Sequence, residues 1–248
     1  MPILPDVSLT ELVLIVGLAA FSGIAGGVAG YGTGALMPLV LVPILGAAPV
    51  VPIIAVSAMF TNSARIFRRA LNLRRAVIAL VAAAPTCVLG AWLYTLLTGR
   101  GAALVIGTSL IATVPLRRLL KSRGHHLGEK GLAAAAAGWG VLVGGTTGAG
   151  VILLSLLMAT GLEGAAVIAT DATVSIVMGV VKLSVFGLAG VLTPVVLAVG
   201  LLIGGIGFFT TFIAKLIVER LPVHVHTAML DVVVIVGGTV MIFGALRP

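Results

Sequence analysis

Apolar residues form long, nearly unbroken runs along this chain, and only short groups of polar residues interrupt them. Runs without alternation between polar and apolar positions predict helices rather than strands. A helix needs about 20 residues to cross a bilayer. The pattern predicts ten apolar elements on either side of a basic loop, at residues 9–29, 34–46, 50–68, 75–98, 101–119, 131–147, 150–161, 164–186, 190–217 and 226–246.

Two glycine-rich segments, residues 26–34 and 144–150, interrupt this helical pattern. Each glycine inside a helix costs about 1 kcal/mol relative to alanine. In hydrocarbon the freed backbone groups also need partners, so such breaks persist only where protein or a water-filled cavity surrounds them. The element after each break is too short for a full crossing. Paired interruptions at matching places in two halves are typical of transporter binding sites.

The two halves match in the order of their elements. We expect a first transmembrane repeat at 1–120, a basic cytoplasmic loop at 121–130 and a second repeat at 131–248. In each half a helix with small polar residues follows the short helix, and both polar helices end on a basic residue, Arg69 or Lys182. We match Ser57, Thr61, Asn62 and Ser63 with Thr170, Asp171, Thr173 and Ser175. Five elements per half is an odd number, so the second repeat is expected to be inverted.

Composition assigns the chain to the polytopic helical membrane proteins. Sixty per cent of the residues are hydrophobic, 9% are charged, and the mean hydropathy is +1.29, which excludes a soluble domain of this size. The net charge of +8 comes largely from basic clusters that flank apolar runs, which is the positive-inside pattern rather than a nucleic-acid groove. We expect a multi-pass protein of the bacterial plasma membrane, with uncharged helical faces that would allow a homodimer.

Two topologies fit these spans. The inverted arrangement of ten elements places the basic clusters in the cytoplasm and both termini outside. The alternative counts each broken helix and its short partner as one span, which gives eight spans with both termini inside. It moves Lys215 and Arg220 outside, so the positive-inside rule favours the inverted arrangement.

The glycine breaks have the chemistry of an anion site. A helix N-terminus carries unpaired N–H groups and about half a positive charge, and two short helices that begin at these breaks would direct both toward the bilayer interior. Close helix packing through small residues is the alternative explanation of the glycines. The candidate binding residues here are Gly30, Thr33, Gly34, Thr146, Thr147 and Gly148.

The polar helices supply further candidates. Ser57, Thr61 and Asn62 share one helix face and Thr170 and Thr173 lie on the matching helix, so both faces are expected to line a central cavity, with packing between helices as the alternative. Arg65 would attract anions to the cytoplasmic mouth.

Asp171 is the strongest single candidate for a functional residue, because a carboxylate within the membrane is costly and is therefore taken as functional by default. It would carry a coupling proton, or balance Arg65 or Lys182, or bond internally to a helix terminus. Lys182 lies near a predicted helix end and is expected to reach the membrane surface by snorkelling.

Enzyme motifs are missing from the sequence. It contains no P-loop, no HExxH and no nucleophile elbow, and no His, Cys and acidic residues stand at zinc-ligand spacing. The single cysteine, Cys87, excludes an intrachain disulfide. We therefore expect a non-enzymatic protein without cofactor or metal, whose partners are a small inorganic or organic anion and the lipid bilayer.

The segment 25–38, AGGVAGYGTGALMP, resembles the TauE/SafE family of sulfite exporters and anion permeases. In that family a glycine-rich stretch runs into a short apolar helix and then into a helix rich in small polar residues, as the region of Ser57 to Asn62 does here. The resemblance implies a secondary carrier that exports sulfite or an organosulfonate. Asp171 departs from the family pattern, which would place a small neutral residue there. A channel or permease for another small ion or solute, and a scaffold without transport, are the alternatives.

Overall fold

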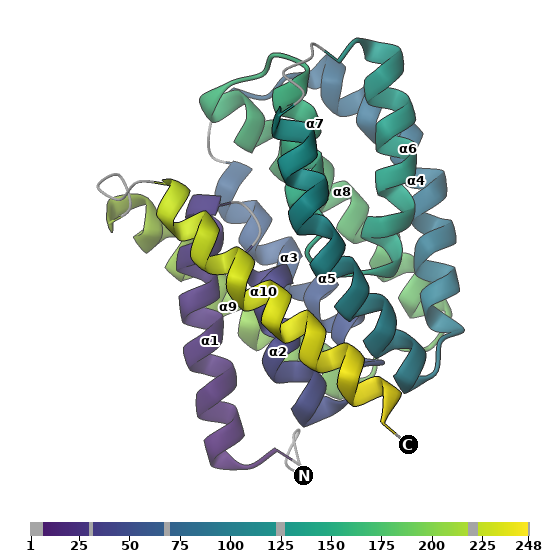
Figure 1. Ribbon diagram of the computed structural model, residues 1–248, viewed down its shortest axis with the longest axis vertical. Coiled ribbons are helices and arrows are strands. Elements are labelled where there is room, and N and C mark those ends of the chain that lie inside the picture. The colour runs from purple at the N-terminus through teal and green to yellow at the C-terminus, as the bar shows by residue number, and fades with distance from the viewer. Residues whose placement is uncertain (1–6, 30–31, 67–69, 123–126, 218–222, 248) are drawn as a thin grey trace.

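A computed structural model describes residues 7–29, 32–66, 70–122, 127–217 and 223–247 of the chain (Figure 1). These described residues form ten helices and no strand. The helices are α1 (Leu9–Ala29), α2 (Gly32–Leu45), α3 (Val50–Ile66), α4 (Leu73–Thr95), α5 (Gly99–Ser122), α6 (Glu129–Gly145), α7 (Gly150–Ala159), α8 (Gly164–Leu188), α9 (Pro194–Ile217) and α10 (Val223–Leu246). The all-helical fold predicted from the apolar runs is confirmed.

Local capping fixes several helix ends. At the start of α1, the Ser8 amide donates to the Glu11 carboxylate at 2.8 Å and the Glu11 amide donates to the Ser8 hydroxyl at 3.3 Å, which is a reciprocal capping box. The side-chain Oδ1 of Asn72 accepts from the Arg75 amide at 3.1 Å and caps the start of α4. This cap explains why α4 begins two residues before the predicted position.

Two helical hairpins bring the glycine-rich segments into the molecule. The end of α1 packs on the start of α2 so closely that a Cβ on Gly32 would clash with the Ser22 carbonyl oxygen. In the second hairpin, the Leu127 amide donates to the Ala159 carbonyl at 2.7 Å, which joins the start of α6 to the end of α7. An ion pair of 2.7 Å between Arg74 and Glu129 holds the starts of α4 and α6 together.

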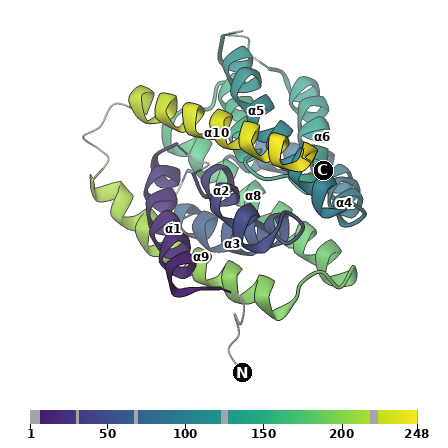
Figure 2. The same cartoon turned by 60° about the horizontal axis from the view of Figure 1, so that its bottom comes forward.

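The remaining helices surround these hairpins. The helix pairs with the most extensive contact are α4 and α6, α3 and α9, α1 and α9, α5 and α10, α3 and α8, and α4 and α8. Seen from another side, α2 and α3 lie in the middle, with α1 and α9 on one flank and α4, α5 and α6 on the other (Figure 2). Glycines permit the tightest of these contacts, since a Cβ on Gly144 would clash with the Cys87 carbonyl oxygen.

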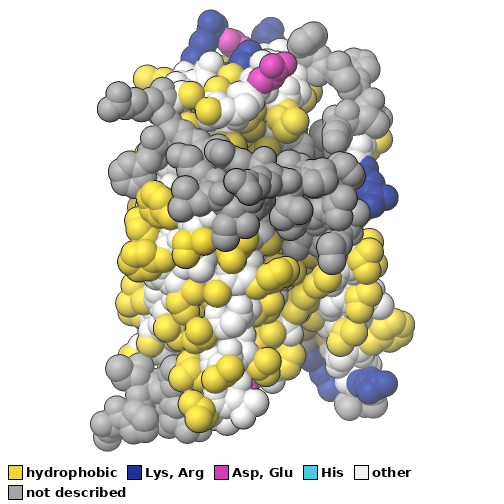
Figure 3. All heavy atoms as spheres, turned by 90° about the vertical axis from the view of Figure 1, so that its left-hand side faces the viewer, with side chains coloured by type: hydrophobic (Ala, Val, Ile, Leu, Met, Phe, Trp, Pro, Cys, Tyr) yellow, Lys and Arg dark blue, Asp and Glu magenta, His cyan; other side chains and the backbone are white. Residues whose placement is uncertain are grey.

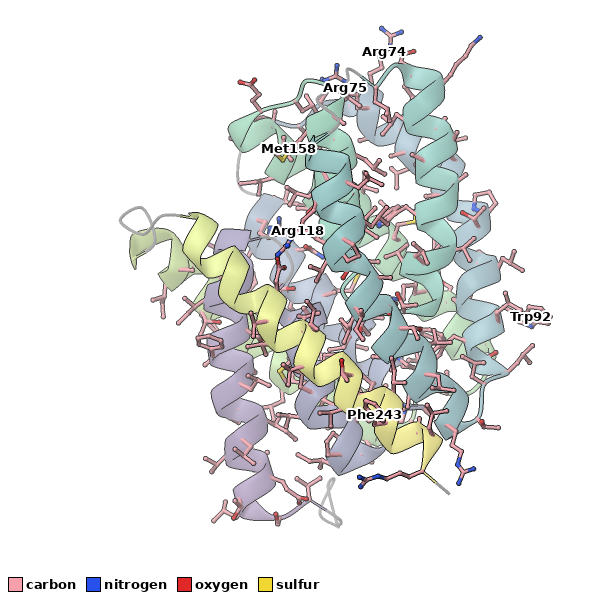
Figure 4. All side chains as sticks on the ribbon, in the orientation of Figure 1. Arg74, Arg75, Trp92, Arg118, Met158 and Phe243 are labelled. Carbon is pink, nitrogen blue, oxygen red and sulfur yellow. The ribbon has the colours of Figure 1, made fainter. Side chains whose placement is uncertain are left out.

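The outer surface fits a lipid environment. Within the described residues, five helices are long and apolar enough to span a membrane. The apolar stretches are Leu9–Gly26, Leu73–Thr95, Gly99–Leu116, Gly164–Leu188 and Pro194–Ala214. Apolar side chains cover much of the lower half of the visible face, and Lys and Arg lie at its top and along its right-hand edge (Figure 3). Trp92 and Phe243 point outward and are 51% and 65% exposed (Figure 4). The chain is a multi-pass membrane protein.

Candidate functional site

The two glycine-rich segments, far apart in the sequence, meet inside the molecule. A Cβ on Gly34 would lie 2.9 Å from the Gly148 amide nitrogen, so no side chain separates the two backbones. Gly148 has a φ of +77°, a left-handed conformation that glycine adopts without steric cost. The first turns of α2 and α7 therefore begin close to one point.

A cavity of about 120 Å³ lies where the hairpins meet α3 and α8. This volume suits a small polyatomic anion with some of its water. The walls come from both glycine-rich segments, from the facing sides of α3 and α8, and from α9. The lining residues are Gly26, Gly32, Thr33, Gly34, Ile54, Ala55, Ala58, Thr61, Asn62, Arg65, Val143, Thr146, Thr147, Gly148, Ala149, Gly150, Ser175, Met178, Gly179, Lys182 and Thr211.

Most residues predicted to bind the anion lie in these walls. They are Thr33, Gly34, Thr61, Asn62, Arg65, Thr146, Thr147 and Gly148. Gly30 lies outside the residues that the structure describes. Ser57, Thr170, Thr173 and Asp171 are described but do not line the cavity.

The predicted residues that do not line the cavity have partners elsewhere. The Ser57 hydroxyl donates to the Ile54 carbonyl at 3.0 Å and the Thr173 hydroxyl donates to the Ala169 carbonyl at 2.8 Å, so both bond within their own helix. The Thr170 hydroxyl accepts from the Asn72 amide at 3.1 Å and ties α8 to the start of α4. These contacts support the polar helices outside the cavity lining.

Asp171 forms a buried ion pair across the α3–α8 interface. Its Oδ2 lies 3.2 Å from Nη2 of Arg65, and the two side chains are 1% and 9% exposed. The Asn62 Oδ1 accepts from Nη1 of Arg65 at 3.1 Å. Arg65 therefore borders the cavity with its positive charge matched by Asp171.

Lys182 is the functional candidate that sequence reasoning missed. The expectation that it reaches the membrane surface is wrong, because α8 continues to Leu188 and the residue is only 6% exposed. Its ammonium lines the cavity and donates to the Thr146 carbonyl at 3.3 Å. The sequence predicts that this helix ends at residue 186, with Lys182 near that end, whereas α8 continues to Leu188 and Lys182 lies within the helix.

Hydrogen bonds fix the second break around this lysine. The Thr146 hydroxyl donates to the Leu142 carbonyl at 2.8 Å, and the Trp139 indole N–H donates to the Ala149 carbonyl at 2.8 Å. Thr147 differs from its neighbours, because its hydroxyl is buried, lines the cavity and has no hydrogen-bond partner. A buried hydroxyl without a partner is costly, so a ligand that bonds to it would be favoured.

The lining positions of α3 and α8 recur at one constant separation. Ala58 and Ser175, Thr61 and Met178, Asn62 and Gly179, and Arg65 and Lys182 are each 117 positions apart. This spacing matches Lys182 with Arg65 rather than with Arg69, which lies outside the described residues. The match between the two polar helices that is expected from the sequence therefore differs from the match that the cavity lining shows.

The cavity combines helix N-termini, hydroxyl groups and two buried cations, which together suit a small anion. Comparison with known proteins supplies one match: a model of the sulfite exporter TauE/SafE family matches residues 11–241. No curated protein and no solved structure shows a significant match to the chain.

Proposed function

This chain belongs to the sulfite exporter TauE/SafE family, and on that premise we propose that it is a secondary carrier that exports a small sulfur-containing oxyanion across the bacterial plasma membrane. The family consists of transporters, so the chain is not an enzyme. Sulfite and organosulfonates are the substrates that the proposal names.

The observation that carries the proposal is the cavity where the two breaks meet. Its polar lining comes from helix N-termini, threonine hydroxyls and the Asn62 amide, and its charged lining among the described residues is Arg65 and Lys182. Both cations are buried. A buried cation that faces a cavity favours an anion there, because burial removes the water that would otherwise solvate it.

The packing supports two inverted repeats, α1–α5 and α6–α10. In this arrangement α1 corresponds to α6, α3 to α8 and α4 to α9. The contact between α4 and α6 then corresponds to the contact between α9 and α1, and the contact between α3 and α9 corresponds to that between α8 and α4; all four contacts are present. The α5–α7 contact likewise becomes α10–α2, while α3–α8 and α5–α10 map onto themselves. In transporters with inverted repeats, access alternates when one bundle rocks against the other around a central site.

Asp171 is the proposed coupling group. It is buried, its Oδ1 has no hydrogen-bond partner, and its Oδ2 pairs with Arg65 next to the cavity. A proton on this carboxylate would weaken its attraction for the Arg65 cation, and so would change the field that an anion in the cavity experiences.

Flux of sulfite from liposomes that contain the purified protein tests the carrier proposal. We expect saturable flux that a second oxyanion on the opposite side accelerates. Gly34→Leu should abolish it because a Cβ there already meets the Gly148 backbone, and Asn62→Leu should reduce it. Val81→Leu, at a 71% exposed position, is the matched control and should transport normally.

Two results would contradict the proposal. Absence of flux across sulfite, sulfate and organosulfonates would remove the transport claim. Flux that neither saturates nor responds to a counter-substrate would indicate a channel.

A further inference from the structure

The two halves of the cavity carry unequal charge. On one side the Arg65 cation faces the Asp171 carboxylate at 3.2 Å. On the other side Lys182 has a single protein partner among the described residues, the neutral Thr146 carbonyl at 3.3 Å. An ammonium has three donors, so the bond to Thr146 leaves two of them for a ligand.

The residues at matching positions of α3 and α8 show where this difference in charge comes from. Arg65 and Lys182 are 117 positions apart, and the position that matches Asp171 at the same separation is Ile54. Ile54 lines the cavity and is 5% exposed. An apolar side chain therefore stands where a symmetric protein would have the carboxylate partner of Lys182.

We infer that Lys182, the Thr147 hydroxyl and the N-terminus of α7 form the anion subsite, and that it selects anions with a single negative charge. This inference rests on the proposed export function. Among the described residues, the charges at the cavity are two cations and the one carboxylate that pairs with Arg65, so one positive charge is left for the ligand. The buried Thr147 hydroxyl, which has no partner, is a second donor directed at the same ligand.

This charge balance favours organosulfonates and hydrogensulfite over the dianions sulfate and sulfite. A dianion would bring one uncompensated negative charge into a buried cavity, which is unfavourable. A neutral molecule of the same shape would leave Lys182 without a counter-charge. The selection thus depends on charge more than on shape, since sulfonate and sulfate groups have similar geometry.

Isothermal titration of the purified full-length protein in detergent tests the subsite with methanesulfonate, sulfate and dimethyl sulfone. We expect the wild-type protein to bind methanesulfonate at least about tenfold more tightly than either other probe. Lys182→Met should weaken methanesulfonate binding by about 10- to 100-fold, as loss of a charged hydrogen bond does. Lys182→Arg keeps the positive charge, so it should weaken methanesulfonate binding by no more than about threefold. This loss is much smaller than the loss expected for Lys182→Met.

The matched pair Ile54→Asp and Ile54→Asn separates charge from packing. Ile54→Asp supplies the missing carboxylate and should abolish methanesulfonate binding. Ile54→Asn is nearly the same size as Ile54→Asp but adds no charge, so it should bind methanesulfonate at least about tenfold more tightly than Ile54→Asp does. Thermal unfolding confirms that both variants are folded before titration. In Asp171→Asn, which removes the existing carboxylate, the preference should move toward sulfate.

Each outcome decides the inference. Equal binding by Ile54→Asp and Ile54→Asn, or sulfate binding in the wild type as tight as that of methanesulfonate, would overturn it and leave the export proposal standing. A wild-type protein that binds neither methanesulfonate nor sulfate would overturn the inference, and absence of sulfite flux as well would overturn the export proposal.

Discussion

The buried hydroxyls and carboxylates of this protein divide by where their hydrogen bonds go. Ser57 and Thr173 bond to carbonyls of their own helices, as polar residues in membrane helices commonly do. Thr147 and one oxygen of Asp171 are buried without a partner. Polar groups left unsatisfied in a folded protein indicate a site where something else binds or where a proton moves.

Thr147→Val should have opposite effects on stability and on binding. Removal of a buried hydroxyl that has no partner should stabilise the ligand-free protein by about 1 kcal/mol, while methanesulfonate binding weakens about tenfold. Thermal unfolding and titration calorimetry measure the two effects. Thr173→Val is the control, because its hydroxyl bonds to Ala169 and does not line the cavity, and it should change binding little. Weaker stability together with unchanged binding in Thr147→Val would contradict this account of the hydroxyl.

Asp171→Asn should flatten the pH dependence of transport. Asparagine keeps the size of the side chain and an oxygen that can accept from Arg65, but it cannot exchange a proton. Flux of methanesulfonate is the suitable measurement, because its charge does not change near neutral pH. An unaltered pH profile in the variant would remove Asp171 from the coupling role.

At the scale of elements, the helix breaks depend on glycine at some positions and not at others. Gly148 adopts a φ of +77°, whereas Gly150 begins α7 and has open space where a Cβ would stand. A count of glycines in the sequence does not distinguish these two roles. The backbone conformation does.

Gly148→Ala should therefore destabilise the protein and lower transport, while Gly150→Ala should leave the stability nearly unchanged. The left-handed conformation costs about 1–2 kcal/mol for alanine, and the added Cβ would also lie 2.9 Å from a Leu110 methyl group. Thermal unfolding and sulfite flux compare the two variants. Equal thermal stability of the two variants would show that Gly148 is not held in the left-handed conformation described.

The helical elements were largely predictable from the sequence, because a long apolar run in a bilayer has no other way to satisfy its backbone. The site was only partly predictable. Thr33, Asn62 and Thr147 follow from the breaks and the polar helix, but Lys182 needed the true length of α8. The asymmetry between Asp171 and Ile54 needed the register between α3 and α8, which glycines and serines alone do not define.

At the scale of the whole molecule, the start of α1 and the end of α10 lie at one end, and Arg74 and Arg75 lie at the opposite end (Figures 1 and 4). This arrangement is the one that the proposed inverted second repeat requires. The positive-inside rule predicts that the arginine end faces the cytoplasm and that α1 begins and α10 ends on the outer side.

Cysteine labelling in intact cells tests this orientation. Cys87, the single cysteine, is fully buried, so the background should be low. A membrane-impermeant maleimide added outside should label Arg247→Cys and leave Lys130→Cys unlabelled until the membrane is opened. The reverse pattern would place the termini in the cytoplasm.

The direct backbone contact between Gly34 and Gly148 has a consequence for how the two halves of the chain can diverge. Side chains that match across the repeats have already become different, with Arg65 opposite Lys182 and Ile54 opposite Asp171. A substitution at either glycine would displace the other half as well as its own. The two proposed repeats can therefore differ in charge while this one contact keeps them in a common geometry.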